Sequence, residues 1–254
     1  MKIGIVCYPT FGGSGVVATE LGLQLSKSKY EVHFITYKQP VRLEIINSSL
    51  FFHEVNVPDY PLFHYQPYEL ALSSKLVDTV KKYNIELLHV HYAIPHAYAA
   101  YMTKKILQSE NINIPIITTL HGTDITLVGK HPFYKPAVRF SINNSDFVTS
   151  VSEDLKKETI KLFEVKKSIK VIPNFVDFSK HLHHGNDFDR EFIARDDEKI
   201  ISHVSNFRKV KRTLDVIDIF YNIQKEINSK LIMVGDGPDR LKCMKKCKKL
   251  GIIE

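Results

Sequence analysis

Short apolar segments alternate with longer amphipathic segments along most of this chain. The sequence predicts strands over 2–8, 31–37, 51–56, 86–90, 114–120, 146–150 and 169–172, and helices over 14–27, 68–83, 95–108, 132–144 and 152–163. A strand, a helix and a further strand in this order predict right-handed crossovers and a parallel sheet covered by helices on both faces. The alternation therefore restricts the chain to the α/β class of folds.

The alternation stops after residue 172. Residues 173–186 have no clear periodicity and are interpreted as a linker, after which strands are predicted over 199–204 and 231–234 and a helix over 213–227. The expected apolar face of that helix consists of Val216, Ile219, Phe220, Ile223 and Ile227. Because two strands do not form an independently stable sheet, the second part is expected to be a fragment or to be completed by another chain.

Composition excludes several classes of protein. Of the 254 residues, 44% are hydrophobic and 25% charged, which is typical of a globular protein and not of a disordered, collagen-like or coiled-coil chain. No apolar run reaches the ~18 residues that a membrane span needs. Three cysteines are too few for a disulfide framework, which favours a cytoplasmic protein with reduced thiols. The net charge of +7 suits anionic small substrates, whereas no nucleic-acid-binding motif is present.

A glycine-rich turn joins the first strand to the first helix. Glycines let the backbone approach a ligand closely, and a helix N-terminus attracts an anion. Gly13, Gly15 and Ala18 also fit the dinucleotide-binding fingerprint, but the second strand ends at Lys38 without the acid that would bind a ribose. The turn therefore predicts a site for phosphate or another anion, with a packing role as the alternative.

Two polar segments follow central strands, where ligands bind in open α/β sheets. The first, HVHYAIPHA over 89–97, makes Tyr92 a candidate ligand contact; metal binding by its H-x-H pattern is the alternative, although a third ligand is missing. The second, TTLHGTD over 118–124, combines hydroxyls, an imidazole and a carboxylate, with a capped turn as the alternative. A serine hydrolase is disfavoured because no G-x-S-x-G pattern occurs.

A basic segment, SNFRKVKR over 205–212, follows the strand that opens the second part. Four cations in five positions at a strand end suit a diphosphate, with an exposed basic turn as the alternative. A further turn, Gly235-Asp236-Gly237-Pro238, follows the next predicted strand.

Taken in order, GGSGVVATELG, HVHYAIPHA, TTLHGTDIT, VIPNFVD, SNFRKVKR and VGDGP resemble the retaining glycosyltransferases of family 4. The resemblance implies the GT-B fold: an N-terminal Rossmann-like domain for the acceptor, here 1–172, and a C-terminal Rossmann-like domain for the nucleotide, here partial over 173–254, with the active site in a cleft between them. The most similar members imply transfer of N-acetylglucosamine from UDP-N-acetylglucosamine to the hydroxyl of L-malate, with retention and without a cofactor or metal.

Matching positions imply roles for particular residues. Near the donor's diphosphate and sugar the resemblance places Gly13, Ser14, Gly15, Asn206, Arg208, Lys211 and Gly235. Of these, Arg208 and Lys211 are implied to act in catalysis, together with His121. The implied malate-binding residues are Tyr92, Thr119 and Arg139. Many members have a glycine directly before the arginine that corresponds to Arg208, where this chain has Ser205-Asn206.

The family's E-x7-E motif, which binds the donor's sugar and ribose, would lie beyond residue 254. The chain alone is therefore expected to be inactive. Two alternatives stay open: a family-4 transferase with another acceptor, and, for the isolated chain, a non-catalytic module that binds a nucleotide or another anion. The sequence leaves the oligomeric state open, a homodimer included.

Overall fold

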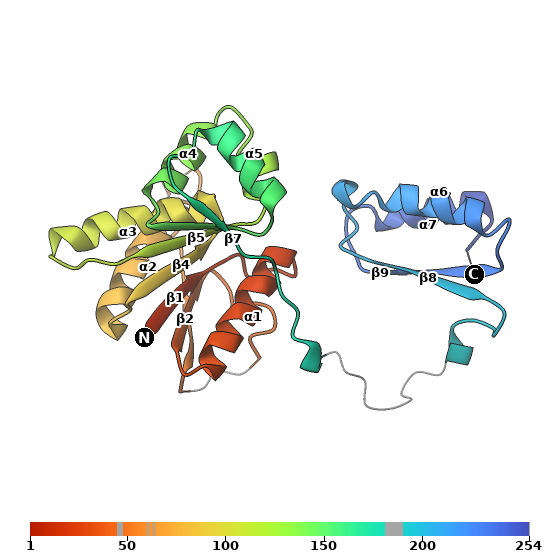
Figure 1. The fold of residues 1–254 in the computed structure, drawn as a ribbon, viewed down its shortest axis with the longest axis horizontal. Helices are drawn as coiled ribbons and strands as arrows, with labels where there is room; N and C mark the ends of the chain where they lie inside the picture. The colour runs from red at the N-terminus through yellow and green to blue at the C-terminus, as the bar shows by residue number, and fades with distance from the viewer. Residues whose placement is uncertain (45–47, 60, 63, 181–189, 254) are drawn as a thin grey trace. The chain divides into compact units, whose positions relative to one another are not determined.

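The chain folds into two compact units, Met1–Val176 and Asp177–Glu254, in a computed structural model that describes residues 1–44, 48–59, 61–62, 64–180 and 190–253 (Figure 1). We describe each unit separately. The predicted boundary at residue 172 falls inside the first unit, and residues 181–189, most of them in or next to the predicted linker, lie outside the described part of the chain.

Unit 1 is built on a parallel sheet of seven strands in the order β3-β2-β1-β4-β5-β6-β7. The strands are β1 (Lys2–Val6), β2 (Glu31–Thr36), β3 (Leu50–Glu54), β4 (Leu87–His91), β5 (Ile116–Leu120), β6 (Phe147–Ser150) and β7 (Ile169–Val171). This sheet confirms the predicted parallel α/β fold.

Helices cover both faces of the sheet because neighbouring residues of each strand point to opposite sides. The helices are α1 (Gly13–Lys27), α2 (Tyr68–Tyr83), α3 (Tyr98–Ser109), α4 (Lys135–Asn144) and α5 (Glu153–Phe163), with short helical segments η1 (Ala93–Ala97) and η2 (Thr123–Leu127). In β1, Ile5 joins the core beneath α1, whereas Val6 joins the core that includes Leu72 and Leu76 of α2. A further core lies beneath α4 and α5.

The strand order reverses between β1 and β4. From β1 the chain moves outward through β2 to β3, and from β4 it moves the other way through β5 to β7. The loops that leave β1 and β4 therefore diverge at their carboxyl ends, and such a switch point is where open α/β sheets bind ligands. The glycine-rich turn follows β1, and Tyr92 follows β4.

Unit 2 contains two parallel strands, β8 (Lys199–Val204) and β9 (Ser229–Val234). Its helices are α6 (Thr213–Ile223) and α7 (Arg240–Leu250), and its short segments are η3 (Phe178–Lys180), η4 (Arg190–Phe192) and η5 (Lys209–Lys211). Both helices lie on one side of the strands (Figure 1). A small core joins Phe207, Ile217 and Cys243, while Val204 is 74% exposed.

The predicted apolar face of α6 is partly wrong. Phe220 is buried as expected, but Ile219 is 59% exposed, and Ile227 lies beyond the end of α6 and is 48% exposed. The buried positions are Thr213, Ile217 and Phe220, which recur at the i, i+4, i+7 spacing of one helix stripe. Apolar residues occur on both sides of this helix, so periodicity did not fix the buried face.

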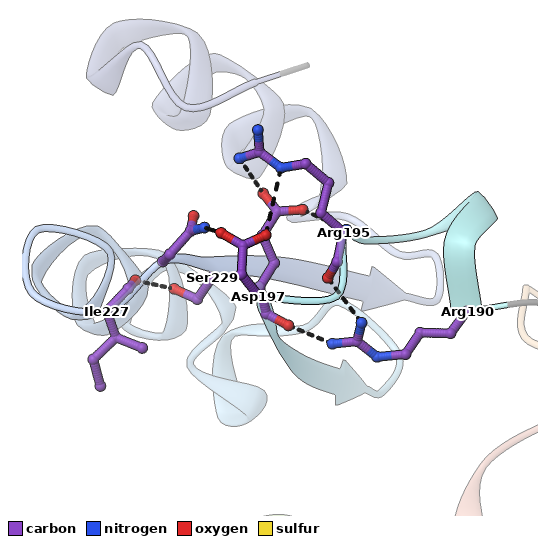
Figure 2. Close-up of polar contacts among 7 residues, drawn as sticks. Arg190, Arg195, Asp197, Ile227 and Ser229 are labelled. Carbon is purple, nitrogen blue, oxygen red and sulfur yellow. Dashed lines mark hydrogen bonds and ion pairs between the residues drawn. The ribbon is translucent and has the colours of Figure 1, made fainter.

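A polar network closes the amino end of β8 and β9. The guanidinium of Arg190 donates to the carbonyl oxygen of Arg195 at 2.8 Å (Figure 2). The side-chain amide of Asn228 donates to the Asp197 carboxylate. The backbone N–H of Arg195 also donates to the Glu198 carboxylate at 2.8 Å. The first and third of these bonds lie within the segment before β8, and the bond to Asp197 ties that segment to the turn before β9. At the opposite, carboxyl end of the strands, β8 leads into the basic turn and β9 into the turn that begins at Gly235.

Candidate functional site

The amino end of α1 is open to an anion. The residue before the helix is Gly12, which has no side chain to accept from the first backbone N–H groups, and the first turn contains no acidic residue. A Cβ at Gly15 would lie 2.3 Å from the carbonyl oxygen of Tyr8, so only glycine fits there. A Cβ at Gly13 would meet nothing within 4 Å, which leaves space beside the start of the helix.

Three loops meet through hydroxyl groups at the switch point. The Ser14 hydroxyl donates to the Tyr92 hydroxyl at 3.1 Å, and the Tyr92 oxygen lies 3.0 Å from the Thr123 hydroxyl. Tyr92 has a φ of 89°, a conformation that costs of order 1–3 kcal/mol in a residue with a side chain. The structure thus brings together Ser14 and Tyr92, which were predicted separately, and adds Thr123.

Next to Tyr92 lies a cluster of imidazoles. Nδ1 of His91 is 2.8 Å from Nε2 of His121, and the His91 ring is near-parallel to the rings of His89 and His121, with centroids 4.6 and 5.1 Å away. The ring of His121 also stacks on Tyr92, with centroids 5.5 Å apart. Burial lowers the pKa of His121 to about 4, so its ring is neutral at neutral pH. No group of three His, Cys, Asp or Glu side chains in the described ranges is arranged to hold a metal ion.

Asp124 fixes the turn that carries His121. Its buried carboxylate accepts from the backbone N–H groups of His121 and Gly122, at 3.2 and 3.0 Å, and from that of Ala93 in η1, at 3.0 Å. Burial raises the pKa of Asp124 to about 6. The capped turn, which was the alternative interpretation of this segment, is therefore present, and it joins the loop after β5 to the loop after β4.

Thr119 and Arg139, the other implied malate residues, have partners of their own. The buried Thr119 hydroxyl lies 2.8 Å from Nε2 of His89 and 2.7 Å from the Thr149 hydroxyl. Arg139, on α4, is exposed and forms an ion pair with Glu164 at 2.8 Å. Among the described residues, neither side chain forms a hydrogen bond or ion pair with Tyr92.

In unit 2 the basic turn presents two cations. Arg208 directly precedes η5 and Lys211 is its last residue; both are exposed, and the part of the chain that the structure describes offers no ion-pair partner to either. Arg212 is different, because its guanidinium pairs with Asp215 at 2.5 Å. The backbone N–H of Lys211 donates to the carbonyl oxygen of Arg208 at 2.8 Å, which keeps the two cations on one turn.

Gly235 holds the turn after β9 against the turn after β8. Its φ is 140°, and a Cβ there would lie 1.8 Å from the carbonyl oxygen of Ser205, so no other residue fits. The next residue, Asp236, accepts from the Phe207 N–H at 2.8 Å. Asn206 lies between these contacts, and its carbonyl oxygen accepts from the Arg208 N–H. The role of Gly235 that the structure shows is therefore close packing of the two turns.

A groove of about 700 Å³ lies in unit 2 between β9 and α7, and Gly235 is among the residues that line it. Its walls include Leu231, Met233, Cys243 and Cys247, and it does not include Arg208 or Lys211. We base the candidate site on the polar geometry at the strand ends, because the groove, although Lys230 and Arg240 help to line it, contains neither cation of the basic turn.

Sequence reasoning did not single out His91, Thr123 and Asp124 as site residues. His91 was quoted within an H-x-H pattern, whose alternation on a strand predicts two imidazoles on one face, and their rings do stack at 4.6 Å. Asp124 was recognised as part of a turn that can be capped. Thr123 belongs to the polar segment 118–124, but its contact with Tyr92 was not predicted, because that contact joins two loops that are 31 positions apart.

A comparison with protein families matches residues 11–180 to Glycosyltransferase Family 4. This chain belongs to that family. It is 46% identical over 243 residues to N-acetyl-alpha-D-glucosaminyl L-malate synthase of Bacillus anthracis, a match that covers 94% of this chain and 62% of that protein. It is 27% identical over 184 residues to a putative teichuronic acid biosynthesis glycosyltransferase, TuaC, of Bacillus subtilis, covering 68% of this chain and 43% of the relative.

Solved structures show the same fold. Anabaena HepE in complex with UDP-glucose superposes with a TM-score of 0.75 at 17% identity, covering 99% of this chain and 66% of HepE. Sucrose-phosphate synthase of Thermosynechococcus elongatus gives 0.72 at 16% identity, covering 99% of this chain and 68% of that one. These likenesses confirm the expected GT-B class. The chain spans less than two thirds of the length of the curated relatives that it matches. No helix in the described ranges is both long and apolar enough to cross a membrane.

Proposed function

We propose that this protein transfers N-acetylglucosamine from UDP-N-acetylglucosamine to the hydroxyl of L-malate with retention at the anomeric carbon, the first step of bacillithiol biosynthesis. The observation that carries the proposal is the hydroxyl junction of Ser14, Tyr92 and Thr123 at the switch point of the sheet, in a chain 46% identical to the L-malate synthase. We place the reaction in the cytoplasm, in keeping with three free thiols at Cys7, Cys243 and Cys247.

Each unit, taken by itself, has a positive feature that suits the donor's diphosphate. In unit 1 the amino end of α1, with open space at Gly13, offers backbone N–H groups and the positive end of the helix dipole. In unit 2 the exposed side chains of Arg208 and Lys211 offer two positive charges to the leaving UDP. Stabilisation of that negative charge is the main task in this reaction, and neither feature requires a metal.

Retention is proposed to proceed by attack from the same face as the leaving group. A double displacement needs a carboxylate that reaches the anomeric carbon, as in retaining glycosidases. Asp124, the carboxylate at this site, is 1% exposed and accepts three backbone N–H groups, so it serves the fold instead. The leaving phosphate then takes up the proton of the malate hydroxyl, and the protein contributes positioning and charge stabilisation.

The acceptor's two carboxylates are proposed to bind at Tyr92 and Arg139. The Tyr92 hydroxyl lies in the junction of the three loops, and Arg139 provides the planar fork that suits a carboxylate. Arg139 would have to leave Glu164, which is feasible because an exposed ion pair contributes only about 0–1 kcal/mol. Thr119 is proposed to support the malate site indirectly, through the hydrogen bond between its buried hydroxyl and the hydroxyl of Thr149.

Incubation of the natural full-length protein with UDP-N-acetylglucosamine and L-malate tests the proposal. We expect mass spectrometry to detect N-acetylglucosaminyl malate in amounts equal to the UDP released, with the α configuration by NMR. Release of UDP without a malate conjugate would contradict the proposal. If a glycoside forms on another acceptor and not on malate, the protein is still a glycosyltransferase, but the assignment of malate as its acceptor is wrong.

A further inference from the structure

His91 is the last residue of β4 and is enclosed by protein, with 1% of its surface exposed. Its Nδ1 lies 2.8 Å from Nε2 of His121, and its Nε2 is buried without a hydrogen-bond partner among the described residues. Burial, reinforced by the imidazoles of His89, His121 and His96, holds the pKa of His91 well below its ordinary value. His91 is therefore neutral, with one N–H and one lone pair shared between its two nitrogens.

The two arrangements of that proton differ in what they leave unpaired. With the proton on Nε2, His91 would bury an N–H group that has no acceptor, and such orphaned donors are rare in native structures. With the proton on Nδ1, the N–H points at Nε2 of His121 and only a lone pair remains unpaired. The second arrangement leaves no buried donor without an acceptor.

His96, in the same cluster, also has its proton on Nδ1 and a buried Nε2 without a partner. Its Nδ1 faces the backbone carbonyl oxygen of His91, which can only accept a hydrogen bond. The proton of His96 therefore sits on Nδ1, and its buried Nε2 is a bare lone pair without a partner. The surroundings of these rings thus already contain one enclosed imidazole lone pair of this kind.

We infer that His91 donates its Nδ1–H to Nε2 of His121 and thereby fixes His121 as the Nδ1–H tautomer, which makes His91 a positioning residue of the candidate site. The Nδ1 of His121 has no partner among the described residues and is not one of the enclosed unpaired atoms. The ring is held flat against Tyr92. His121 accordingly presents a fixed N–H donor.

This tautomer restricts what His121 can do to a ligand. Its Nε2 lone pair is occupied by His91, so the ring cannot accept a proton or hydrogen bond from a substrate. The free Nδ1–H selects an oxygen acceptor, such as a sugar hydroxyl, an amide carbonyl or a phosphate oxygen. If the proposed function holds, on which this step rests, His121 donates a hydrogen bond to the nucleotide sugar and does not act as a general base.

Nitrogen-15 NMR of the 254-residue chain with labelled histidine tests the inference directly. Protonated and bare imidazole nitrogens have well-separated shifts, and each nitrogen is assigned through its couplings to the ring protons. We expect protonated-type signals at Nδ1 of both His91 and His121, and bare-type signals at their Nε2 atoms. A protonated-type signal at Nε2 of His121 overturns the inference, whatever variants show.

The variant His91→Leu removes the donor and should abolish the single-tautomer pattern, leaving intermediate shifts at both nitrogens of His121. His53→Leu is the matched control, because His53 also bonds to another histidine, His33, at 2.8 Å but lies in β3. An unchanged His121 spectrum in His91→Leu would show that something else sets the tautomer. The spectra need no substrate, so absence of transferase activity would refute the proposed function and leave this inference standing.

Discussion

At the scale of single residues, the structure separates groups that a ligand can reach from groups that hold the site together. Tyr92 and Ser14 meet at the switch point, whereas Thr119 and Asp124 are buried and bonded to protein. The sequence predicted the strand ends on which they stand, because apolar runs mark where strands finish. It could not predict which hydroxyls are buried against protein and which meet at the switch point, since that depends on contacts between segments about 30 positions apart.

Arg139 and Glu164 form an ion pair, and substitutions of the two residues should have different effects on the KM for malate. Arg139→Ala should raise the KM for malate about tenfold or more, because a hydrogen bond to a charged group contributes roughly 1.5–3 kcal/mol. Glu164→Gln removes the competing carboxylate and should lower that KM or leave it unchanged. Steady-state kinetics with malate varied at saturating donor measure both. An unchanged malate dependence in Arg139→Ala would remove this residue from the acceptor site.

Asp124→Asn tests whether the buried carboxylate organises the loops. In either orientation of the new amide, its NH2 group faces a backbone N–H that the carboxylate now accepts, so a donor meets a donor. We expect the free energy of unfolding to fall by about 1–3 kcal/mol in urea denaturation. Asp154→Asn, at an exposed position in the first turn of α5, is the control and should cost no more than about 1 kcal/mol. Equal effects of the two substitutions would show that Asp124 has no special role.

At the scale of elements, the alternation of strands and helices was informative and the orientation of a helix was less so. Every strand of unit 1 formed near its predicted position, because buried parallel strands require apolar runs. The helix α6 was predicted with a partly wrong face, because Ile219 is apolar yet points away from the core that Ile217 enters. Packing against α7 and β9, which the local sequence does not record, selected the buried stripe.

The start of α1 yields a matched pair of glycine substitutions. Gly15→Ala places a methyl group 2.3 Å from one carbonyl oxygen and 2.6 Å from another, and should destabilise unit 1 by about 1–3 kcal/mol or more. Gly13→Ala meets open space, so the free energy of unfolding should stay the same or rise slightly. It should nevertheless weaken UDP-N-acetylglucosamine binding by about tenfold, or about 1.4 kcal/mol, because the methyl group occupies the space beside the diphosphate. Calorimetry and denaturation separate the two effects, and unchanged binding in Gly13→Ala would place the ligand elsewhere.

At the scale of the whole molecule, unit 1 gathers buried histidines that should make its stability depend on pH. Burial lowers the pKa values of His89, His96 and His121 to about 4, and it holds the pKa of His91 well below its ordinary value. Unfolded histidines titrate near 6.5, so between about pH 4 and 6.5 the unfolded chain binds more protons than the folded one. Stability of unit 1 should therefore rise with pH across that window, by up to about 1.4 kcal/mol per pH unit for each group.

Asp124 acts in the opposite direction. Its pKa is raised to about 6, so the folded state binds the extra proton, and this single group lowers stability as pH rises from about 4 to 6. Four histidines outweigh one carboxyl, so the net slope should be positive. Urea denaturation at a series of pH values measures this slope. None of the five groups lies in unit 2, so the amides of unit 2 serve as the internal control. A flat or falling stability of unit 1 over the window would contradict the burial of these imidazoles.

The two units should also unfold separately, because each has its own core. In unit 2 the strand β8 leaves Val204 exposed and shares a sheet with one other strand, so we expect its amides to exchange hydrogen faster than those of β1 and β4.

Ile217→Ala deletes the one fully buried isoleucine among the described residues of unit 2, at a cost of about 2–5 kcal/mol. Exchange followed by mass spectrometry should then show unit 2 losing protection while the strands of unit 1 keep theirs. Parallel loss in β1 and β4 would mean that the two units form one cooperative structure, and equal protection of β8 and β4 in the unaltered chain would contradict the lower stability of unit 2.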